Sequence, residues 1–370
     1  MIPRYRRFWV LLIAALLALP LLVGLVTPDR TVSTEEARQL APAPVLPASP
    51  AAWLKLPGQV DAYLRDHFGL RGLFIRTYAA LMSQSMFGEG NGRVLTGLNG
   101  WMFFRGDAML AESAGLLRRD QRVAAAADIA AAMNRALALR GIRMVVASPP
   151  NSATIYGDQL PLWATNRGQQ TEYDLFLDDL AQRGVPAADL RPALRAGRAH
   201  GKVYRMHDSH WTALGAVAAF NAIVEADRHP DWRLDAASVL GPPETITGGD
   251  LARMLGGDAD VTETDRLLTL PPGQRRLFTP EPFATYLATG DRAEPTIMII
   301  GDSFTGSLFT PMLLRHAGKV AWLYNDGCAF DWKWIEQFHP DEVWWMPTER
   351  LIVCRPGASP NGLPVRGADD

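Results

Sequence analysis

Two short segments, far apart in the chain, carry the side chains of a possible nucleophilic centre. The first reads Asp208-Ser-His-Trp-Thr212 and the second reads Gly301-Asp-Ser-Phe304. A serine hydroxyl is a weak nucleophile until a neighbouring base accepts its proton. His210 can be that base for Ser303, and a carboxylate such as Asp208 can orient the imidazole. The pattern therefore predicts a Ser-His-Asp catalytic triad.

The elements around these segments decide whether the side chains can meet. The apolar run 295–300 precedes Ser303 and is typical of a buried strand, so we expect the serine at an exposed turn at the carboxyl edge of a sheet. We expect strand 203–206 to lead into the other segment. Side chains alternate along a strand, which would put Asp208 and His210 on one face with Ser209 facing away. Alternatively, Ser303 is a turn or N-cap residue and His210 a core histidine.

Composition indicates a globular protein. The chain has 370 residues, of which 48% are hydrophobic and 21% charged, enough for one large or two ordinary domains. The formal net charge is −2, without the basic excess that nucleic-acid binding requires, so no nucleic-acid partner is expected.

The chain contains two cysteines, Cys328 and Cys354. In an oxidising compartment they could form a disulfide that stabilises the fold by about 3 kcal/mol. The alternative is a pair of thiols. No Cys/His cluster has zinc-finger spacing, so neither a metal nor a cofactor is expected.

The N-terminus has the pattern of a membrane segment. Arg4, Arg6 and Arg7 precede an uncharged apolar run over 8–26, which as a helix would span about 28 Å. The arginines should stay in the cytoplasm. We therefore expect residues 1–27 to be a single inner-membrane anchor with the catalytic domain in the periplasm. A cleaved signal peptide is the alternative, although its apolar region is normally shorter.

The remaining chain divides by composition and periodicity. From about residue 120 strands alternate with helices, which predicts an α/β fold with a mostly parallel sheet covered on both faces. A helical region over 53–88 and a strand pair over 93–96 and 101–104 precede this part. The expected divisions are a Pro/Ala-rich linker at 28–52, a catalytic domain at 53–355 with an irregular insertion at about 229–290, and a flexible tail at 356–370.

These motifs together resemble the AlgJ/AlgX group of alginate O-acetyltransferases, which are SGNH-hydrolase-like proteins. The resemblance implies an α/β/α sandwich in which the Asp-x-His segment precedes Gly-Asp-Ser, a permuted order relative to ordinary SGNH hydrolases. Besides the N-terminal anchor, the matching pieces are Asp66–Arg71, Gly100–Phe104, Pro149–Tyr156, Asp208–Thr212 and Gly301–Phe304.

The resemblance also implies a function. An acetyl group carried on Ser303 would be transferred to an exported polysaccharide, with His210 as general base and Asp208 as its orienting partner. A multispanning membrane acyltransferase would deliver the acetyl group across the inner membrane. A carbohydrate acetyl esterase with the same triad, or a non-catalytic polysaccharide-assembly factor, are the alternatives.

Five further residues are candidates for substrate contacts. Aromatic rings can stack on sugars, whereas tryptophans in apolar runs belong to the core. An arginine could bind an anionic sugar or form a structural ion pair. An asparagine amide could donate to an oxyanion, or could simply hold a turn. The candidates are Trp332 and Trp334 for stacking, Arg71 for an anionic sugar, and Asn151 and Asn325 for the oxyanion.

Overall fold

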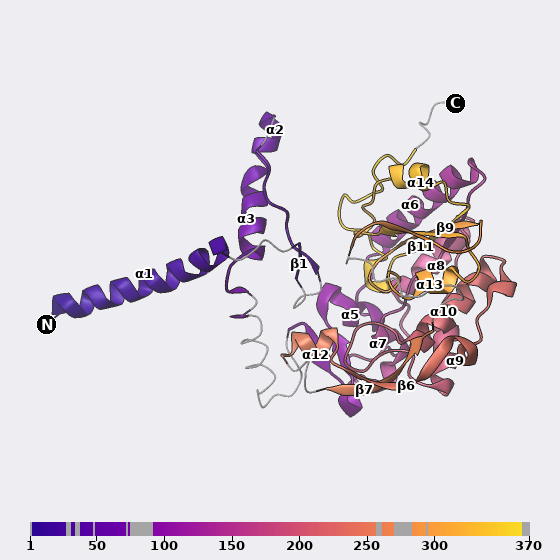
Figure 1. Cartoon of the computed structure of the whole chain (residues 1–370), viewed down its shortest axis with the longest axis horizontal. Coiled ribbons are helices and arrows are strands. Elements are labelled where there is room, and N and C mark those ends of the chain that lie inside the picture. The colour runs from indigo at the N-terminus through magenta and orange to yellow at the C-terminus, as the bar shows by residue number, and fades with distance from the viewer. Residues whose placement is uncertain are drawn as a thin grey trace. The chain divides into compact units, whose positions relative to one another are not determined.

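The chain forms two compact units, described here separately (Figure 1). One unit comprises residues 1–91 and 252–258, and the other comprises 92–251 and 259–370. The second unit starts at Gly92, not at residue 53, where the catalytic domain was expected to begin. The computed structural model describes residues 2–26, 31–33, 38–46, 49–71, 73–74, 92–256, 261–269, 283–293 and 295–364.

The first unit contains the apolar N-terminal helix. Within α1 (Ile2–Val26), residues Tyr5–Gly24 have a mean hydropathy of 2.2 and are long and apolar enough to cross a membrane. Within the helical region predicted over 53–88, α3 ends at Asp66 and residues 71 and 73–74 are again helical, while residues 72 and 75–88 lie outside the described residues. The other elements are β1 (Val32–Ser33) paired antiparallel with β2 (Arg38–Gln39), α2 (Pro50–Trp53) and α3 (Leu56–Asp66).

A five-stranded sheet organises the second unit. The strand order is β5-β11-β9-β10-β8. The first four strands are parallel, and β8 is antiparallel at the edge, which confirms the mostly parallel sheet. The strands are β5 (Arg143–Val146), β8 (Tyr286–Thr289), β9 (Thr296–Gly301), β10 (Lys319–Tyr324) and β11 (Glu342–Met346).

Each face of the sheet packs on its own hydrophobic core. Successive residues of β9 alternate between the two cores, with Ile297 and Ile299 in one and Met298 and Ile300 in the other. Figure 1 shows α6 and α14 on one side of β9 and β11, with α9 and α10 on the other. The unit is thus an α/β/α sandwich. Its main helices are α6 (Asp120–Ala138), α8 (Glu172–Gln182), α9 (Arg191–Gly197), α10 (Ala213–Ala226), α13 (Phe309–Leu313) and α14 (Lys333–Phe338).

The segment 229–290, predicted to be an irregular insertion, contains regular structure. Its last described strand, β8, completes the main sheet. Residues 257–260 and 270–282 of this segment lie outside the described part of the chain. It contains α11 (Ala236–Val239), β6 (Leu240–Thr247) paired antiparallel with β7 (Thr262–Leu268), and α12 (Asp250–Met254).

The smaller elements confirm the predicted strand pair. Strand β3 (Val94–Thr96) pairs antiparallel with β4 (Met102–Phe104) through a short turn at Leu98–Gly100. Two short helices, α5 (Met109–Ser113) and α7 (Ser152–Ile155), complete the unit.

The C-terminal segment is fastened to the sandwich. Cys328 and Cys354 form a disulfide with a Cα–Cα distance of 5.2 Å. Beyond it, the Asn361 N–H donates to the Phe330 carbonyl at 2.7 Å and the Trp332 N–H donates to the Asn361 carbonyl at 2.9 Å. Asn361, in the predicted flexible tail at 356–370, is thus hydrogen-bonded to the sandwich, and residues 365–370 of that prediction lie outside the described range.

A buried carboxyl pair lies at the amino-terminal end of the sheet. The Asp227 carboxyl accepts a hydrogen bond from Trp344 Nε1 at 2.7 Å, and Arg143 donates to Glu342. Burial raises the pKa of Asp227 to about 7, and the hydrogen bond and charge of Glu342 add to the increase. Asp227 therefore holds its proton more tightly in the folded chain than in the unfolded one.

This pair predicts a specific pH dependence of stability. A raised carboxyl pKa favours the folded state fully below the unfolded pKa, and this contribution is lost as pH rises towards the folded pKa. Relative to Asp227→Asn, the wild-type free energy of unfolding should fall by roughly 3 kcal/mol between about pH 4 and about pH 7. Urea denaturation across this range measures the difference. The exposed control Asp231→Asn should track the wild type, and an Asp227→Asn curve parallel to wild type would contradict the assignment.

Candidate active site

Ser303 lies in the turn that follows β9, a central strand of the sheet. The Asp302 carboxylate holds this turn, because Oδ1 accepts from the Phe304 N–H at 3.1 Å and Oδ2 accepts from the Thr348 N–H at 3.1 Å. A side chain at Gly301 would collide with the Thr305 hydroxyl, so the close turn requires glycine there. The turn leaves Ser303 exposed at the carboxyl edge of the sheet, as predicted.

The segment that carries His210 is a bend and not a continuation of a strand. Only an antiparallel bridge between Tyr204 and Trp211 replaces the strand predicted at 203–206. Asp208 Oδ1 accepts both from the His210 backbone N–H at 2.9 Å and from His210 Nδ1 at 2.7 Å. The predicted pair therefore meets, but through a local turn. Ser209 Oγ lies 3.4 Å from His210 Nδ1, so Ser209 does not face away as the strand argument predicted.

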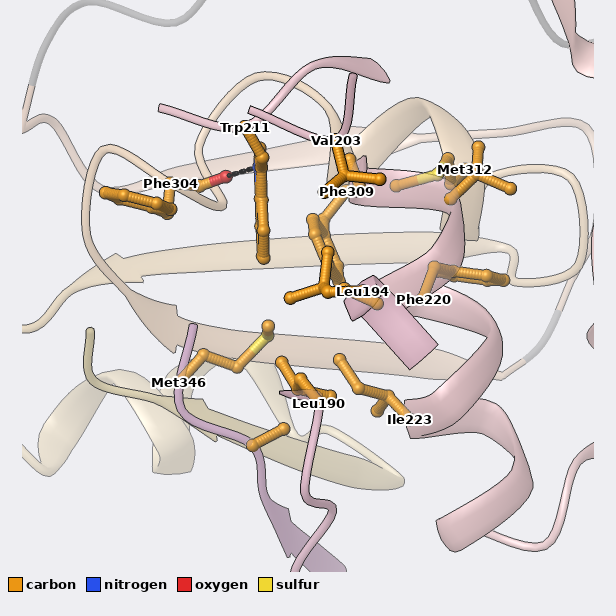
Figure 2. Packing of buried hydrophobic residues seen from close by; sticks show 14 of the residues in the cluster. Leu190, Leu194, Val203, Trp211, Phe220, Ile223, Phe304, Phe309, Met312 and Met346 are labelled. Atoms are coloured by element: carbon orange, nitrogen blue, oxygen red, sulfur yellow. Dashed lines mark hydrogen bonds between the residues drawn. The ribbon is translucent and has the colours of Figure 1, made fainter. Parts of the chain in front are cut away.

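Buried contacts join the two segments. The Trp211 indole Nε1 donates to the Phe304 carbonyl at 3.0 Å, the bond drawn in Figure 2. The two rings pack edge to face at 5.3 Å. Thr212 caps α10, because its side chain accepts from the Gly215 N–H at 3.1 Å. These contacts place His210 Nε2 2.9 Å from Ser303 Oγ.

The charges around His210 suit a general base. Burial lowers the pKa of His210, but the charge and hydrogen bond of Asp208 outweigh burial and raise the pKa above its ordinary value. Burial raises the pKa of Asp208, yet the contacts with His210 overcome it and hold that pKa well below the usual range. An ionised carboxylate, an imidazole and a hydroxyl in this order can activate the hydroxyl for attack on a carbonyl carbon.

Two charged residues that the sequence analysis did not identify, Asp250 and Arg350, lie beside these side chains. The Asp250 N–H donates to Asp208 Oδ2 at 3.1 Å. Arg350 places its guanidinium 5.4 Å from the Phe304 ring and 5.6 Å from the Phe104 ring, with its side chain only 13% exposed. In the sequence, Asp250 follows two glycines and Arg350 follows Thr348-Glu349. Neither context is a motif that indicates a catalytic residue.

The two predicted oxyanion asparagines are fully buried, so neither exposes an N–H to a substrate. Asn151 Nδ2 donates to Ser113 Oγ at 3.2 Å. Asn325 Oδ1 accepts from the Cys328 N–H at 3.2 Å, and the Asn325 N–H donates to the Gly301 carbonyl. The contacts of Asn151 Nδ2 and Asn325 Oδ1 fit the turn-residue alternative, and an oxyanion role of either amide stays a prediction.

The three predicted glycan contacts differ in their surroundings. Trp332 is 1% exposed and belongs to one of the two cores, so its predicted stacking on a sugar was wrong. Trp334 is half-buried and stacks on Phe338 at 5.5 Å. Arg71 lies in the first unit, where its Nη1 donates to the Arg65 carbonyl at 2.8 Å. Sugar contacts of Trp334 and Arg71 stay predictions.

Two groups of described residues have the spacing of metal ligands, with their ligand atoms within 4.8 Å of one another. In each, protein donors already engage the carboxylates: Asp227 and Glu342 accept from Trp344 and Arg143, and Asp208 and Asp250 accept from His210 and Ser209. The groups are Asp208, His210 and Asp250, and Asp227, His229 and Glu342.

Most of the second unit matches a known family. Residues 94–352 match the family described as "SGNH hydrolase-like domain, acetyltransferase AlgX". The chain belongs to this AlgX family. The matched range includes Asp208, His210, Asp250, Ser303 and Arg350.

Two relatives of this AlgX-family chain are each named "Probable alginate O-acetylase AlgJ". The one from Pseudomonas aeruginosa is 27% identical over 270 residues, covering 68% of this chain and 65% of the relative. The one from Azotobacter vinelandii is 26% identical over 224 residues, covering 60% of this chain and 55% of the relative. The chain thus spans less than two thirds of the length of these relatives. The structure of Bacillus cereus PatB1 shares the fold, with a TM-score of 0.54 at 11% identity, over 71% of this chain and 97% of that chain.

The hydrogen bond between Asp208 and His210 predicts how the imidazole titrates. In the wild type the His210 pKa should lie above the ordinary value of about 6.5. In Asp208→Asn the carboxylate charge is gone, so burial should dominate and lower the pKa below that value. NMR of histidine-labelled protein measures both titrations. An unchanged His210 titration in Asp208→Asn would contradict the assigned coupling.

Proposed function

We propose that this AlgX-family protein is an O-acetyltransferase that uses Asp208, His210 and Ser303 as a catalytic triad. The observation that supports it is the hydrogen-bonded chain itself, with 2.7 Å from Asp208 to His210 and 2.9 Å from His210 to the exposed Ser303 hydroxyl. The acceptor would be a hydroxyl of an exported polysaccharide of the alginate type, in keeping with the printed names of the relatives.

The proposed reaction has two balanced halves. As Ser303 Oγ attacks the acetyl carbonyl of the donor, His210 Nε2 takes the hydroxyl proton and then delivers it to the leaving group. The acetyl group is now an ester of Ser303. His210 next removes the proton of an acceptor hydroxyl, that oxygen attacks the ester carbonyl, and the proton returns to Ser303 Oγ. Asp208 stabilises the imidazolium that forms in each half.

The protein also offers groups for the developing charge and for the acceptor. Among the described residues, the Ser303 N–H donates to no carbonyl or side chain, which leaves it available for the oxyanion. Arg350 supplies a positive charge beside Phe304 that suits an acidic polymer. Exclusion of water from the acetyl-serine would favour transfer over hydrolysis.

An acetyl-transfer assay tests the proposal. With an activated acetyl ester and an alginate oligosaccharide, the purified protein should acetylate the oligosaccharide. Ser303→Ala and His210→Ala should each lower the rate by a factor on the order of 10³ or more, because triad members act as a unit. Ser307→Ala, another exposed serine in the same turn, is the matched control and should retain activity.

The assay also separates the alternatives. Ester hydrolysis that depends on Ser303 but never yields acetylated oligosaccharide would favour an acetyl esterase. No Ser303-dependent turnover of any acetyl ester would contradict the triad and favour a non-catalytic assembly factor.

We propose further that α1 anchors the protein in the inner membrane and that the second unit lies in the periplasm. The apolar span Tyr5–Gly24 supports the anchor, and the disulfide between Cys328 and Cys354 supports an oxidising compartment. A multispanning membrane acyltransferase would then supply acetyl groups as the partner. The protein should stay in the membrane fraction after carbonate extraction, and a released protein beginning near residue 27 would contradict the anchor.

A further inference from the structure

We propose that Asp250 is a positioning residue of the active centre, which holds the Asp208–His210 pair in place and adds a second negative charge beside the imidazole. This inference rests on the proposed function and deepens it. Asp250 begins α12, in the segment predicted to be an irregular insertion, and its side chain is buried.

The hydrogen bonds of Asp250 fix both ends of the catalytic bend. Its backbone N–H donates to Asp208 Oδ2 at 3.1 Å, while Asp208 Oδ1 is engaged by His210, so both oxygens of the Asp208 carboxylate are held. Its own carboxylate accepts from the Ser209 N–H at 2.7 Å and from Ser209 Oγ at 2.5 Å. Asp250 thereby fixes the rotation of the Asp208 carboxylate and the path of the residue between Asp208 and His210.

The close approach depends on the residue before Asp250. A Cβ at Gly249 would collide with the His207 carbonyl and would lie 3.2 Å from the Asp208 nitrogen. Only glycine, which lacks a Cβ, lets the two segments lie this close together. The contact between residues 249–250 and the backbone of residues 207–208 therefore requires glycine at position 249.

Asp250 also contributes charge. Its Oδ2 lies 3.7 Å from His210 Nδ1. The charged groups that act on the imidazole are Asp208 and Asp250, which favour the protonated form, and Arg350, which opposes it. Burial raises the pKa of Asp250, and the charge of Asp208 raises it further while His210 opposes the increase. The three groups Asp208, His210 and Asp250 therefore titrate as an interacting set.

Two substitutions separate positioning from charge. Asp250→Asn retains the backbone N–H that donates to Asp208, and its amide can still bond Ser209 through one oxygen and one N–H, so it removes mainly the charge. Asp250→Ala removes the bonds to Ser209 as well. The exposed control Asp291→Asn loses one negative charge elsewhere.

The readout is the pH profile of kcat/KM for an activated acetyl ester, with kcat and KM determined separately. We expect the rising limb of Asp250→Asn to move to lower pH, because the imidazolium loses a neighbouring anion, while Asp291→Asn keeps the wild-type midpoint. We expect Asp250→Ala to lose about 100-fold in kcat with KM little changed, as for a displaced catalytic group. Circular dichroism and thermal melts verify that each variant is folded.

An Asp250→Asn midpoint equal to wild type, or an Asp250→Ala kcat equal to wild type, would overturn the proposal. If Asp250→Ala does not fold, the Asp250→Asn midpoint alone decides. If the wild-type protein itself shows no Ser303-dependent turnover, the proposed function fails, and the His210 titration followed by NMR then decides on Asp250. A lower His210 pKa in Asp250→Asn supports the contact, and an unchanged one refutes it.

Discussion

The proposed active centre depends on the docking of the bend at Asp208–Trp211 against the turn at Gly301–Phe304. The hydrogen bond from the Trp211 indole to the Phe304 carbonyl, with the packing of the two rings, brings together segments that are distant in the chain. Both partners lie in the same hydrophobic core of the sandwich. The packing of Trp211 against Phe304 therefore fixes the distance between His210 and Ser303, which are their neighbours in the chain.

The parallel sheet explains where this docking occurs. Strand β9 lies between β10 and β11, and the chain leaves β9 to form β10 before returning across it to β11. The strand that follows β9 in the chain lies on one side of it and the next lies on the other side. In α/β sheets, ligands characteristically bind at the carboxyl ends of strands where the strand order reverses in this way. Ser303 occupies this position, while Asp302 ties the turn to Thr348, just beyond β11.

The pKa values of Asp208 and His210 reflect their burial and their contacts at the carboxyl edge of the sheet. Asp208 stays ionised because His210 and backbone N–H groups compensate its desolvation, and His210 gains proton affinity in return. Asp250 and Arg350 carry opposite charges and act on His210 in opposite directions. Such fixed charges can stabilise a transition state without rearrangement of the surroundings.

Sequence patterns predicted the parts of this arrangement that depend on local chemistry. The apolar run before Ser303 and the Asp-x-His spacing are patterns of this local kind. The bend at Asp208 was mistaken for a strand, because an Asp carboxylate that accepts from the backbone N–H two residues later leaves no periodic pattern in the sequence. Asp250 and the burial of Trp332, Asn151 and Asn325 arise from contacts between distant segments, which one sequence does not encode as a motif.

The most direct test of the central claim is to identify the acetylated residue. The protein is mixed briefly with an activated acetyl ester, quenched in acid, digested and examined by mass spectrometry. The account predicts one acetyl group on Ser303, which disappears when an oligosaccharide acceptor is added before the quench. Acetylation only at other residues, or equal labelling of Ser303→Ala, would contradict it.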